Sequence, residues 1–169
     1  MRSSGHKDKK TEAFASKGMA EPGKKAHGLL VVIDGTEHSQ HALEMALGLC
    51  MELGKPLLAM YVVDTAAMEY LVRMRVILPS EREMFRKDME KKGERYLQNA
   101  VAVAATHGVT LETVITTGHF DQSVLEFVRK RAFDLVLIGG SRHANTWDEA
   151  VHARQLLMDR MPCPLLVVK

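Results

Sequence analysis

Four short, uninterrupted apolar runs constrain most strongly what this chain can fold into. They occupy residues 29–33, 57–63, 135–138 and 165–168. Strands that are apolar on both faces are typical of a parallel sheet covered by helices on both sides. Residues 109–116 alternate more regularly between apolar and polar side chains, which predicts a fifth strand nearer the edge of the same sheet.

Helical patterns separate these runs. The first has apolar residues every three or four positions, at Leu43, Ala46, Leu47, Cys50 and Leu53. Ser80 followed by Glu83 reads as a capping box that opens a long helix to about His107. Asp121 is predicted to cap a third helix, and a fourth runs from about Trp147. Residues 65–79 fit either a short helix or a loop.

The alternation of strands and helices predicts right-handed crossovers, and hence an α/β fold with an open, doubly wound, five-stranded parallel sheet. The length of 169 residues suits one domain. Residues 1–27 lack a sustained apolar period, so we predict a disordered basic tail at 1–27 and a single domain at 28–169.

Charge and cysteine content narrow the classes of function. The tail holds seven Lys or Arg against three acids, which more than accounts for the net charge of +2 of the whole chain. The tail is either a solvated segment or a basic extension that contacts an anionic partner. Residues 28–169 are close to neutral and give no indication of specific nucleic-acid binding. We predict a cytoplasmic protein without a membrane anchor. The chain has two isolated cysteines, no apolar run of about 18 residues and polar first residues.

Four passages, taken in order and spacing, resemble the universal stress protein family. They are Leu30–Ser39, Leu57–Asp64, Asp134–Ser141 and Pro162–Val168. The resemblance covers about residues 29–169. It implies the three-layer sandwich of adenine nucleotide alpha hydrolase-like proteins with strand order 3-2-1-4-5, a role in the stress response, and a homodimer paired through the last strand, Leu165 to Val168.

Members of that family that bind ATP share a loop of the form Gly, two residues, Gly, nine residues, then Gly and Ser or Thr. Counted from Gly140, the second glycine position holds His143 and the closing pair is Ala153 and Arg154. Counted back from the Pro162–Pro164 segment, the closing pair falls on Val151 and His152. Neither register restores the motif, so the chain is more similar to the UspA-type branch that does not bind ATP.

Acidic residues support the same interpretation without reference to the family. Asp148 and Glu149 fall in the first turn of the helix that would face the phosphates. Acids there suit the helix dipole, but they repel a triphosphate at the same place.

The candidate remnant of a nucleotide pocket consists of Asp34, Gly139, Gly140, Ser141 and His143. Asp34 follows the first strand, where open α/β sheets bind ligands, although it is equally suited to capping the turn. Ser141 is either an anion contact or part of a polar loop. We therefore expect a stress-response homodimer without catalytic residues or a cofactor. The alternative is an ATP- or AMP-binding member that acts as a nucleotide-dependent switch or a slow ATPase.

Other features give no competing site. His38 and His41 lie three residues apart but lack a metal-binding spacing with acids or cysteines, so we expect surface histidines and no metal. His119 and His143, each following a strand, are a weaker lead for a phosphate site. The sequence contains no nucleophile elbow and no Walker A motif. The eleven methionines are expected mainly to fill gaps in the core.

Overall fold

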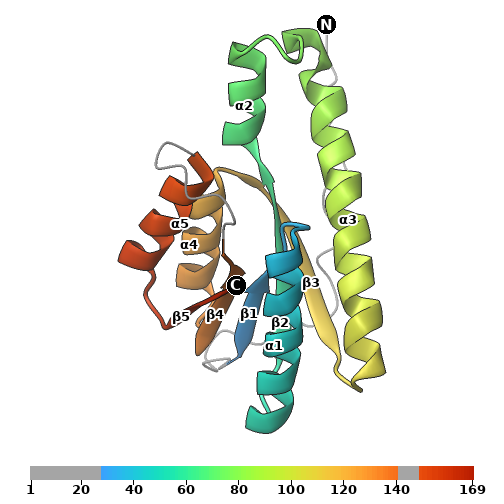
Figure 1. Cartoon of the computed structure of the whole chain (residues 1–169), viewed down its shortest axis with the longest axis vertical. Coiled ribbons are helices and arrows are strands. Elements are labelled where there is room, and N and C mark those ends of the chain that lie inside the picture. The colour runs from blue at the N-terminus through green and yellow to red at the C-terminus, as the bar shows by residue number, and fades with distance from the viewer. Residues whose placement is uncertain (1–27, 141–148) are drawn as a thin grey trace, which may run out of the picture.

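The computed structural model describes residues 28–140 and 149–169. The described elements alternate between strands and helices (Figure 1). In chain order they are β1 (Leu29–Val32), α1 (Glu37–Leu53), β2 (Leu57–Asp64), α2 (Thr65–Arg73), a 3-10 turn η1 (Pro79–Glu81), α3 (Arg82–Thr106), β3 (Leu111–Gly118), α4 (Phe120–Lys130), β4 (Leu135–Gly139), α5 (Glu149–Arg160) and β5 (Leu165–Val168).

The five strands form one parallel sheet in the order β3-β2-β1-β4-β5, which confirms the predicted fold class and strand order. β1 lies at the centre, with Leu29 opposite Leu57 of β2 on one side and Leu135 of β4 on the other. The more polar β3 lies at one edge, as its alternating pattern predicts, and β5 lies at the other.

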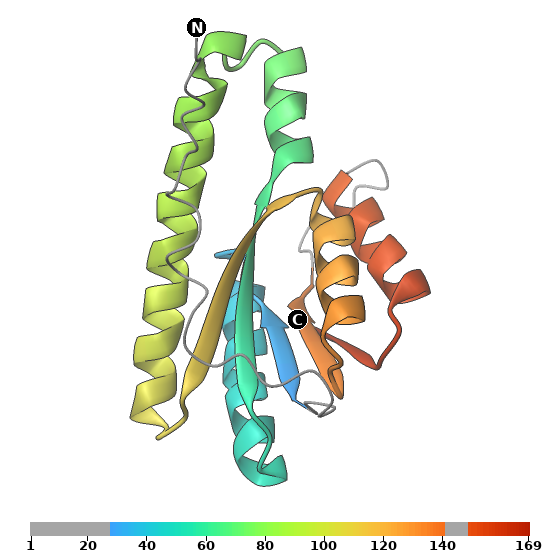
Figure 2. The ribbon, with the colours of Figure 1, turned by 180° about the vertical axis from the view of Figure 1, so that it is seen from behind.

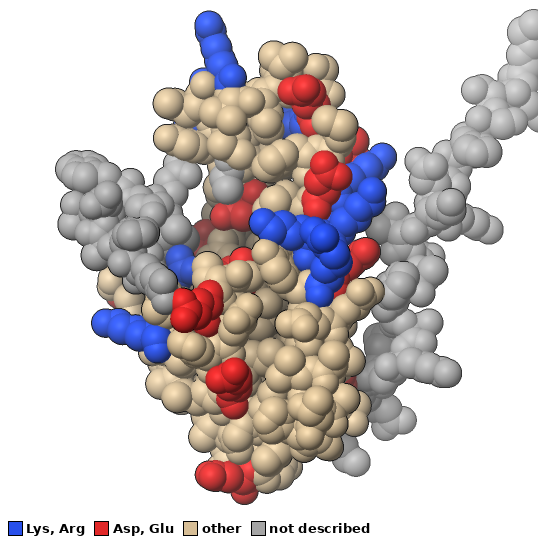
Figure 3. Space-filling model, turned by 45° about the vertical axis from the view of Figure 1, so that its right-hand side comes forward, with Lys and Arg blue, Asp and Glu red and all other residues tan. Residues whose placement is uncertain are grey.

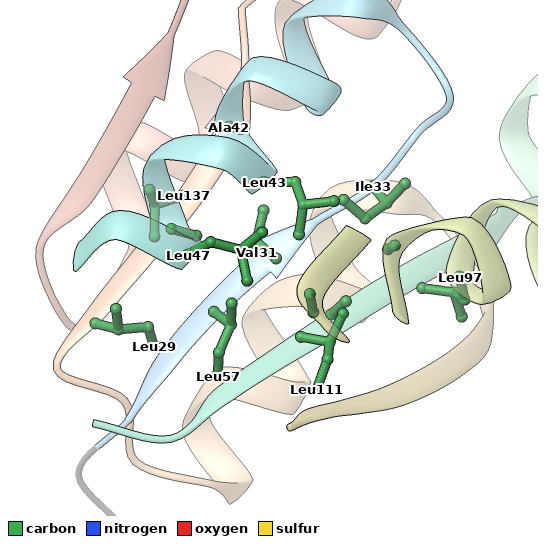
Figure 4. Packing of buried hydrophobic residues seen from close by; sticks show 14 of the residues in the cluster. Leu29, Val31, Ile33, Ala42, Leu43, Leu47, Leu57, Leu97, Leu111 and Leu137 are labelled. Carbon is green, nitrogen blue, oxygen red and sulfur yellow. The ribbon is translucent and has the colours of Figure 1, made fainter. Parts of the chain in front are cut away.

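Two apolar cores cover the two faces of the sheet. Leu29 and Val31 of β1 point towards α1 and α3, and Figure 4 shows them packed with Leu43 and Leu47 of α1. Leu30, the next residue along the strand, belongs to the opposite core with α4 and α5. Because successive side chains of a strand point to opposite faces, one continuous apolar run serves both cores.

Two predicted helix starts are wrong in detail. Ser80 does not cap the long helix, because a turn of 3-10 helix precedes α3 and no side chain caps it. Instead, the Glu81 carboxylate accepts a hydrogen bond from the backbone N–H of Leu78 at 2.9 Å. Asp121 does not cap α4, since the cap position is His119 and Asp121 lies in the first turn. An acid in that turn still favours the helix dipole.

Of residues 65–79, for which a short helix and a loop were both open, 65–73 form a helix and a turn follows it. α2 follows β2 directly, because the Asp64 carboxylate accepts a hydrogen bond from the N–H of Ala66 at 2.9 Å and caps the helix. The described part of the chain thus has five α-helices and not four. Figures 1 and 2 show α2 and the first half of α3 extending together beyond the sheet. We call residues 65–91 the arm.

The methionines do not mainly fill the core, contrary to the sequence-based expectation. Of the nine described methionines, Met60 and Met68 are buried, Met89 and Met161 pack against the cores while partly exposed, and five are exposed. The exposed ones are Met45, Met51, Met74, Met84 and Met158. Apolar composition alone does not distinguish a core methionine from one that a helix presents to solvent.

Candidate ligand site at the carboxyl ends of the strands

The loop that leaves β1 fixes the carboxylate of Asp34. Its Oδ1 accepts hydrogen bonds from the backbone N–H and the hydroxyl of Thr36, at 2.9 and 2.6 Å. Gly35 has a φ of +81°, and a Cβ at this position would lie 2.3 Å from the ring of Tyr96. Only glycine fits that turn without displacing the ring, so local sequence and the packing of α3 together set where Asp34 points.

The first turn of α1 follows this loop directly and is fixed by its own cap. Thr36 caps the helix by accepting a hydrogen bond from the N–H of Ser39 at 3.2 Å, and the fully buried Ser39 hydroxyl donates back to the Thr36 carbonyl at 2.8 Å. A Cβ on Gly139 would lie 2.6 Å from the Ser39 nitrogen. Gly139 therefore lets the end of β4 approach the backbone of α1.

Arg154 links α5 to the carboxyl ends of β1 and β4 and to the start of α4. Its Nη2 donates to Oδ2 of Asp34 at 2.8 Å, and its Nε donates to the carbonyl oxygen of Gly139 at 3.1 Å. The guanidinium also lies over the ring of Phe120, 5.8 Å from its centre. The Arg154 and Asp34 side chains are 15% and 25% exposed, so the ion pair is shielded from most solvent. Arg154 thus neutralises the acid at the end of β1.

A pocket of about 200 Å³ lies beside this ion pair. Its lining consists of Ile33, Asp34, Tyr61, Val62, Asp64, Met89, Phe120 and Arg154. Figure 3 shows the molecule hollowed below the arm, with charged side chains near the opening. Burial, and then the negative charges of Tyr96 and Asp34, raises the pKa of Tyr61 above its ordinary value. Apolar walls with a few polar groups at one end are typical of small-ligand pockets.

The structure brings together some of the residues that the sequence nominates. Asp34 and Gly139 meet through Arg154. The N–H of Gly140 donates to the carbonyl of Val168 at 2.7 Å, so Gly140 serves the pairing of β4 with β5. Ser141 and His143 lie outside the described residues, as do Trp147 and Asp148. Glu149 is described as the first residue of α5, without its side chain.

Arg154 is the residue that sequence reasoning missed. Counted from Gly140, it occupies the position where the ATP-binding pattern has Ser or Thr. That replacement marked a departure from a motif, but it did not indicate a partner, because Asp34 lies 120 positions earlier in the chain. The available signal was a long cationic side chain at a place where the pattern requires a small hydroxyl.

The remaining candidates form no second centre in the part of the chain that the structure describes. No three His, Cys, Asp or Glu side chains gather there as a metal site. The rings of His38 and His41 meet edge to face, with centres 6.4 Å apart. Burial raises the pKa of both thiols, Cys50 and Cys163, which disfavours the reactive thiolate. None of the helices among residues 28–140 and 149–169 is long and apolar enough to cross a membrane.

Comparison with known proteins agrees with this architecture. The universal stress protein family model matches residues 27–169. Universal stress protein YxiE of Bacillus subtilis is 26% identical over 145 residues, which cover 83% of this chain and 97% of that protein. The structure of UspA from Lactobacillus plantarum has a TM-score of 0.70 at 19% identity, covering 86% of this chain and 99% of that one.

A further solved structure is relevant to the site. It is a universal stress protein family protein from Arabidopsis thaliana with AMP bound, and it has a TM-score of 0.60 at 18% identity, covering 85% of this chain and 91% of that chain. At such identities the likeness of the solved structures shows the fold alone. Because the family model matches well over half of the chain, the chain belongs to the universal stress protein family.

Proposed function

We propose that this protein is a cytoplasmic, stress-response homodimer that holds no ATP and has no catalytic activity of its own. One observation carries the proposal: Arg154 binds Asp34 and Gly139 at the carboxyl ends of β1 and β4. Ligands of open α/β sheets bind at this edge. Here a side chain of the protein itself satisfies the acid that a ligand would use.

Size supports the same proposal. The pocket of about 200 Å³ is smaller than the roughly 300–1,000 Å³ of typical ligand sites. A nucleoside triphosphate therefore requires either a movement of α5 or exposure of its phosphates outside the pocket.

The alternative is an AMP- or ATP-binding protein that acts as a switch or a slow ATPase. It is favoured by the pocket itself, which combines apolar walls with Asp34 and Arg154. If the Arg154 guanidinium leaves Asp34, it becomes available to a phosphate, and the carboxylate becomes available to a donor on the ligand. The AMP-bound plant relative shows that the family fold can hold a nucleotide in that protein.

Calorimetric titration with ATP and AMP separates the two proposals. The wild-type protein is expected to give no binding at micromolar concentrations. Arg154→Ala releases Asp34 and enlarges the pocket, so any weak nucleotide binding is expected in this variant first. Arg131→Ala, which removes a guanidinium from an exposed pair with Glu112, is the matched control and is expected to behave like wild type. Micromolar binding of ATP by the wild-type protein would refute the proposal.

The homodimer is proposed to pair through β5. In the described sheet β5 is an edge strand, and three of its four residues are partly exposed. The carbonyls of Pro164 and Val168 accept hydrogen bonds from the N–H groups of Val136 in β4 and of Gly140, the residue after β4. Since alternate residues of a parallel strand bond to opposite sides, the N–H of Val167 points to the open edge. An exposed edge of this kind invites pairing with a second subunit.

Val167→Pro tests this interface without removing a bond to β4. Proline deletes the outward N–H, so the variant is expected to have half the mass of the wild-type protein by light scattering. Val167→Ala keeps the N–H and is expected to remain dimeric. Equal masses for all three proteins would exclude β5 as the interface.

A further inference from the structure

The end of the arm exposes a concentrated group of large apolar side chains. We call residues 70–84 the tip. It holds five of the ten large hydrophobic residues that are exposed in the described part of the chain. They are Tyr70, Met74, Val76, Leu78 and Met84, with exposures of 45–66%. Isolated exposed apolar residues are ordinary, but a concentration of this kind marks an interaction surface.

The arm's own packing does not account for these side chains. Met68 on α2 is buried, and Leu71, Val72 and Phe85 are partly buried, so the arm already has an apolar side covered by its own residues. The tip residues remain exposed in addition to that covered side. Figures 1 and 2 show the arm standing clear of the sheet, which gives another molecule access to its end.

The backbone at the tip supports a role beyond folding. α2 ends in a Schellman motif, in which the N–H of Val76 donates to the Leu71 carbonyl at 2.9 Å and that of Arg75 donates to the Val72 carbonyl at 3.0 Å. The left-handed residue of this motif is usually glycine, but here it is Arg75, with a φ of +56°. A non-glycine residue in this conformation is strained. The chain therefore tolerates strain where it places a charged side chain among exposed apolar ones.

Charge indicates which partner the tip fits. It carries three arginines, Arg73, Arg75 and Arg82, against two glutamates, Glu81 and Glu83. Figure 3 shows the end of the arm as a largely uncharged surface with few basic side chains. This near balance gives little attraction to a polyanion or an anionic membrane. It also leaves little net charge repulsion between two identical tips.

The exposed apolar area supplies much of what pairing of two copies requires. Each exposed side chain offers on the order of 100 Å². Five of them supply more than half of the about 800 Å² that each partner buries in a specific interface. The aliphatic stems of the three arginines provide further apolar area at the margin.

We propose that the tip of the arm is a second self-association surface, which pairs two copies of this chain about a two-fold axis. The surface is separate from the β5 edge, since β5 and the arm lie at opposite sides of the sheet (Figure 1). If β5 also pairs, two two-fold interfaces on one subunit generate a closed tetramer where their axes intersect at right angles. The inference does not rest on the proposed function.

Sedimentation velocity on the full chain tests this proposal. The double variant Val76→Glu with Leu78→Glu places two charges in the surface, so its mass is expected to be half that of the wild-type protein at the same concentration. Val101→Glu is the matched control, since Val101 is a similarly exposed residue on α3 away from the tip. It is expected to keep the wild-type mass. Circular dichroism confirms that each variant is folded.

The outcomes distinguish self-association of the tip from binding to a membrane. A double variant with the wild-type mass, or a wild-type protein that is monomeric across the concentration range, would overturn the inference. Vesicles containing phosphatidylglycerol provide the second probe. Binding of wild-type protein that is lost in the double variant, without a change in mass, would assign the tip to a membrane and reject self-association. Val167→Pro combined with the double variant separates the interfaces, because each change is expected to halve the mass independently.

Discussion

The ion pair between Arg154 and Asp34 can be measured directly by a double-mutant cycle. Arg154→Met keeps most of the side-chain volume but removes both hydrogen bonds, and Asp34→Asn keeps the acceptor for Thr36 but removes the charge. An exposed ion pair contributes about 0.2–1 kcal/mol, whereas breaking a buried one costs about 3–5 kcal/mol. With side chains 15% and 25% exposed, this pair lies between the two limits. We expect a coupling free energy of about 1.5–2.5 kcal/mol.

The single substitution of Arg154 is expected to cost slightly more than the coupling. It also leaves the Gly139 carbonyl without its hydrogen bond from Nε, whereas Asp34 retains both bonds to Thr36. A loss of about 2–3 kcal/mol in the free energy of unfolding results. For a chain of this size, each kcal/mol lowers Tm by roughly 2–4 °C. Urea unfolding followed by circular dichroism gives all four corners of the cycle.

A second cycle provides the control. Arg131 and Glu112 form an arginine–carboxylate pair at 3.0 Å, but their side chains are 38% and 50% exposed. Their coupling is expected to stay within about 0.2–1 kcal/mol and to weaken with added salt. If the Asp34 and Arg154 substitutions were additive within about 0.5 kcal/mol, the guanidinium would not be holding the carboxylate, and the argument for a self-occupied site would fail.

Three further predictions concern packing, strain and pH. Gly93→Ala is expected to destabilise the protein by about 1–3 kcal/mol, because its Cβ would lie 2.3 Å from the Tyr61 ring. Gly48→Ala, on the open surface of α1, is expected to stabilise the protein by about 0.5–1 kcal/mol. Urea midpoints in the reverse order would contradict this account of the packing. Arg75→Gly relieves a left-handed backbone and is expected to raise the free energy of unfolding by about 0.5–1 kcal/mol, so a lower Tm would argue against strain. The raised pKa of Tyr61 means that the unfolded chain ionises first as pH rises. The contribution of neutral Tyr61 to the free energy of unfolding is therefore fully present below pH 10, the ordinary value for tyrosine, and is lost as pH rises through the pKa of the folded protein. Tyr61→Phe should flatten the alkaline fall in stability, and an unchanged slope would exclude Tyr61 as its source.

The sheet was predictable from sequence because its signal is local. β1 and β4 are buried on both faces, so every residue in them is apolar and the run itself identifies the strand. β3 could be assigned to an edge because polar residues interrupt its apolar ones. Helix ends were less predictable. Ser80 has the composition of a cap, but a 3-10 turn ending at Glu81 precedes α3 and leaves the hydroxyl without that role.

The arm could not be predicted with the same security. α2 has nine residues, too few for stable helix formation in isolation, so its existence depends on packing against α3. The outward direction of Met74 and Met84 depends on the same packing. A sequence pattern can show that residues 65–79 are partly apolar, but it does not show which of these side chains remain exposed.

The site shows how the acid at the end of β1 is met by a side chain of the same protein. A carboxylate held at the end of β1 by Thr36 is costly to shield from solvent unless a cation or a donor meets it. A bound ligand can supply that donor, and here Arg154 supplies it from α5. An intramolecular partner acts at an effective concentration on the order of millimolar or higher, without the entropy cost of capturing a free molecule. A ligand that needs Asp34 must therefore compete with Arg154, and occupancy of the site depends on the strength of this one ion pair.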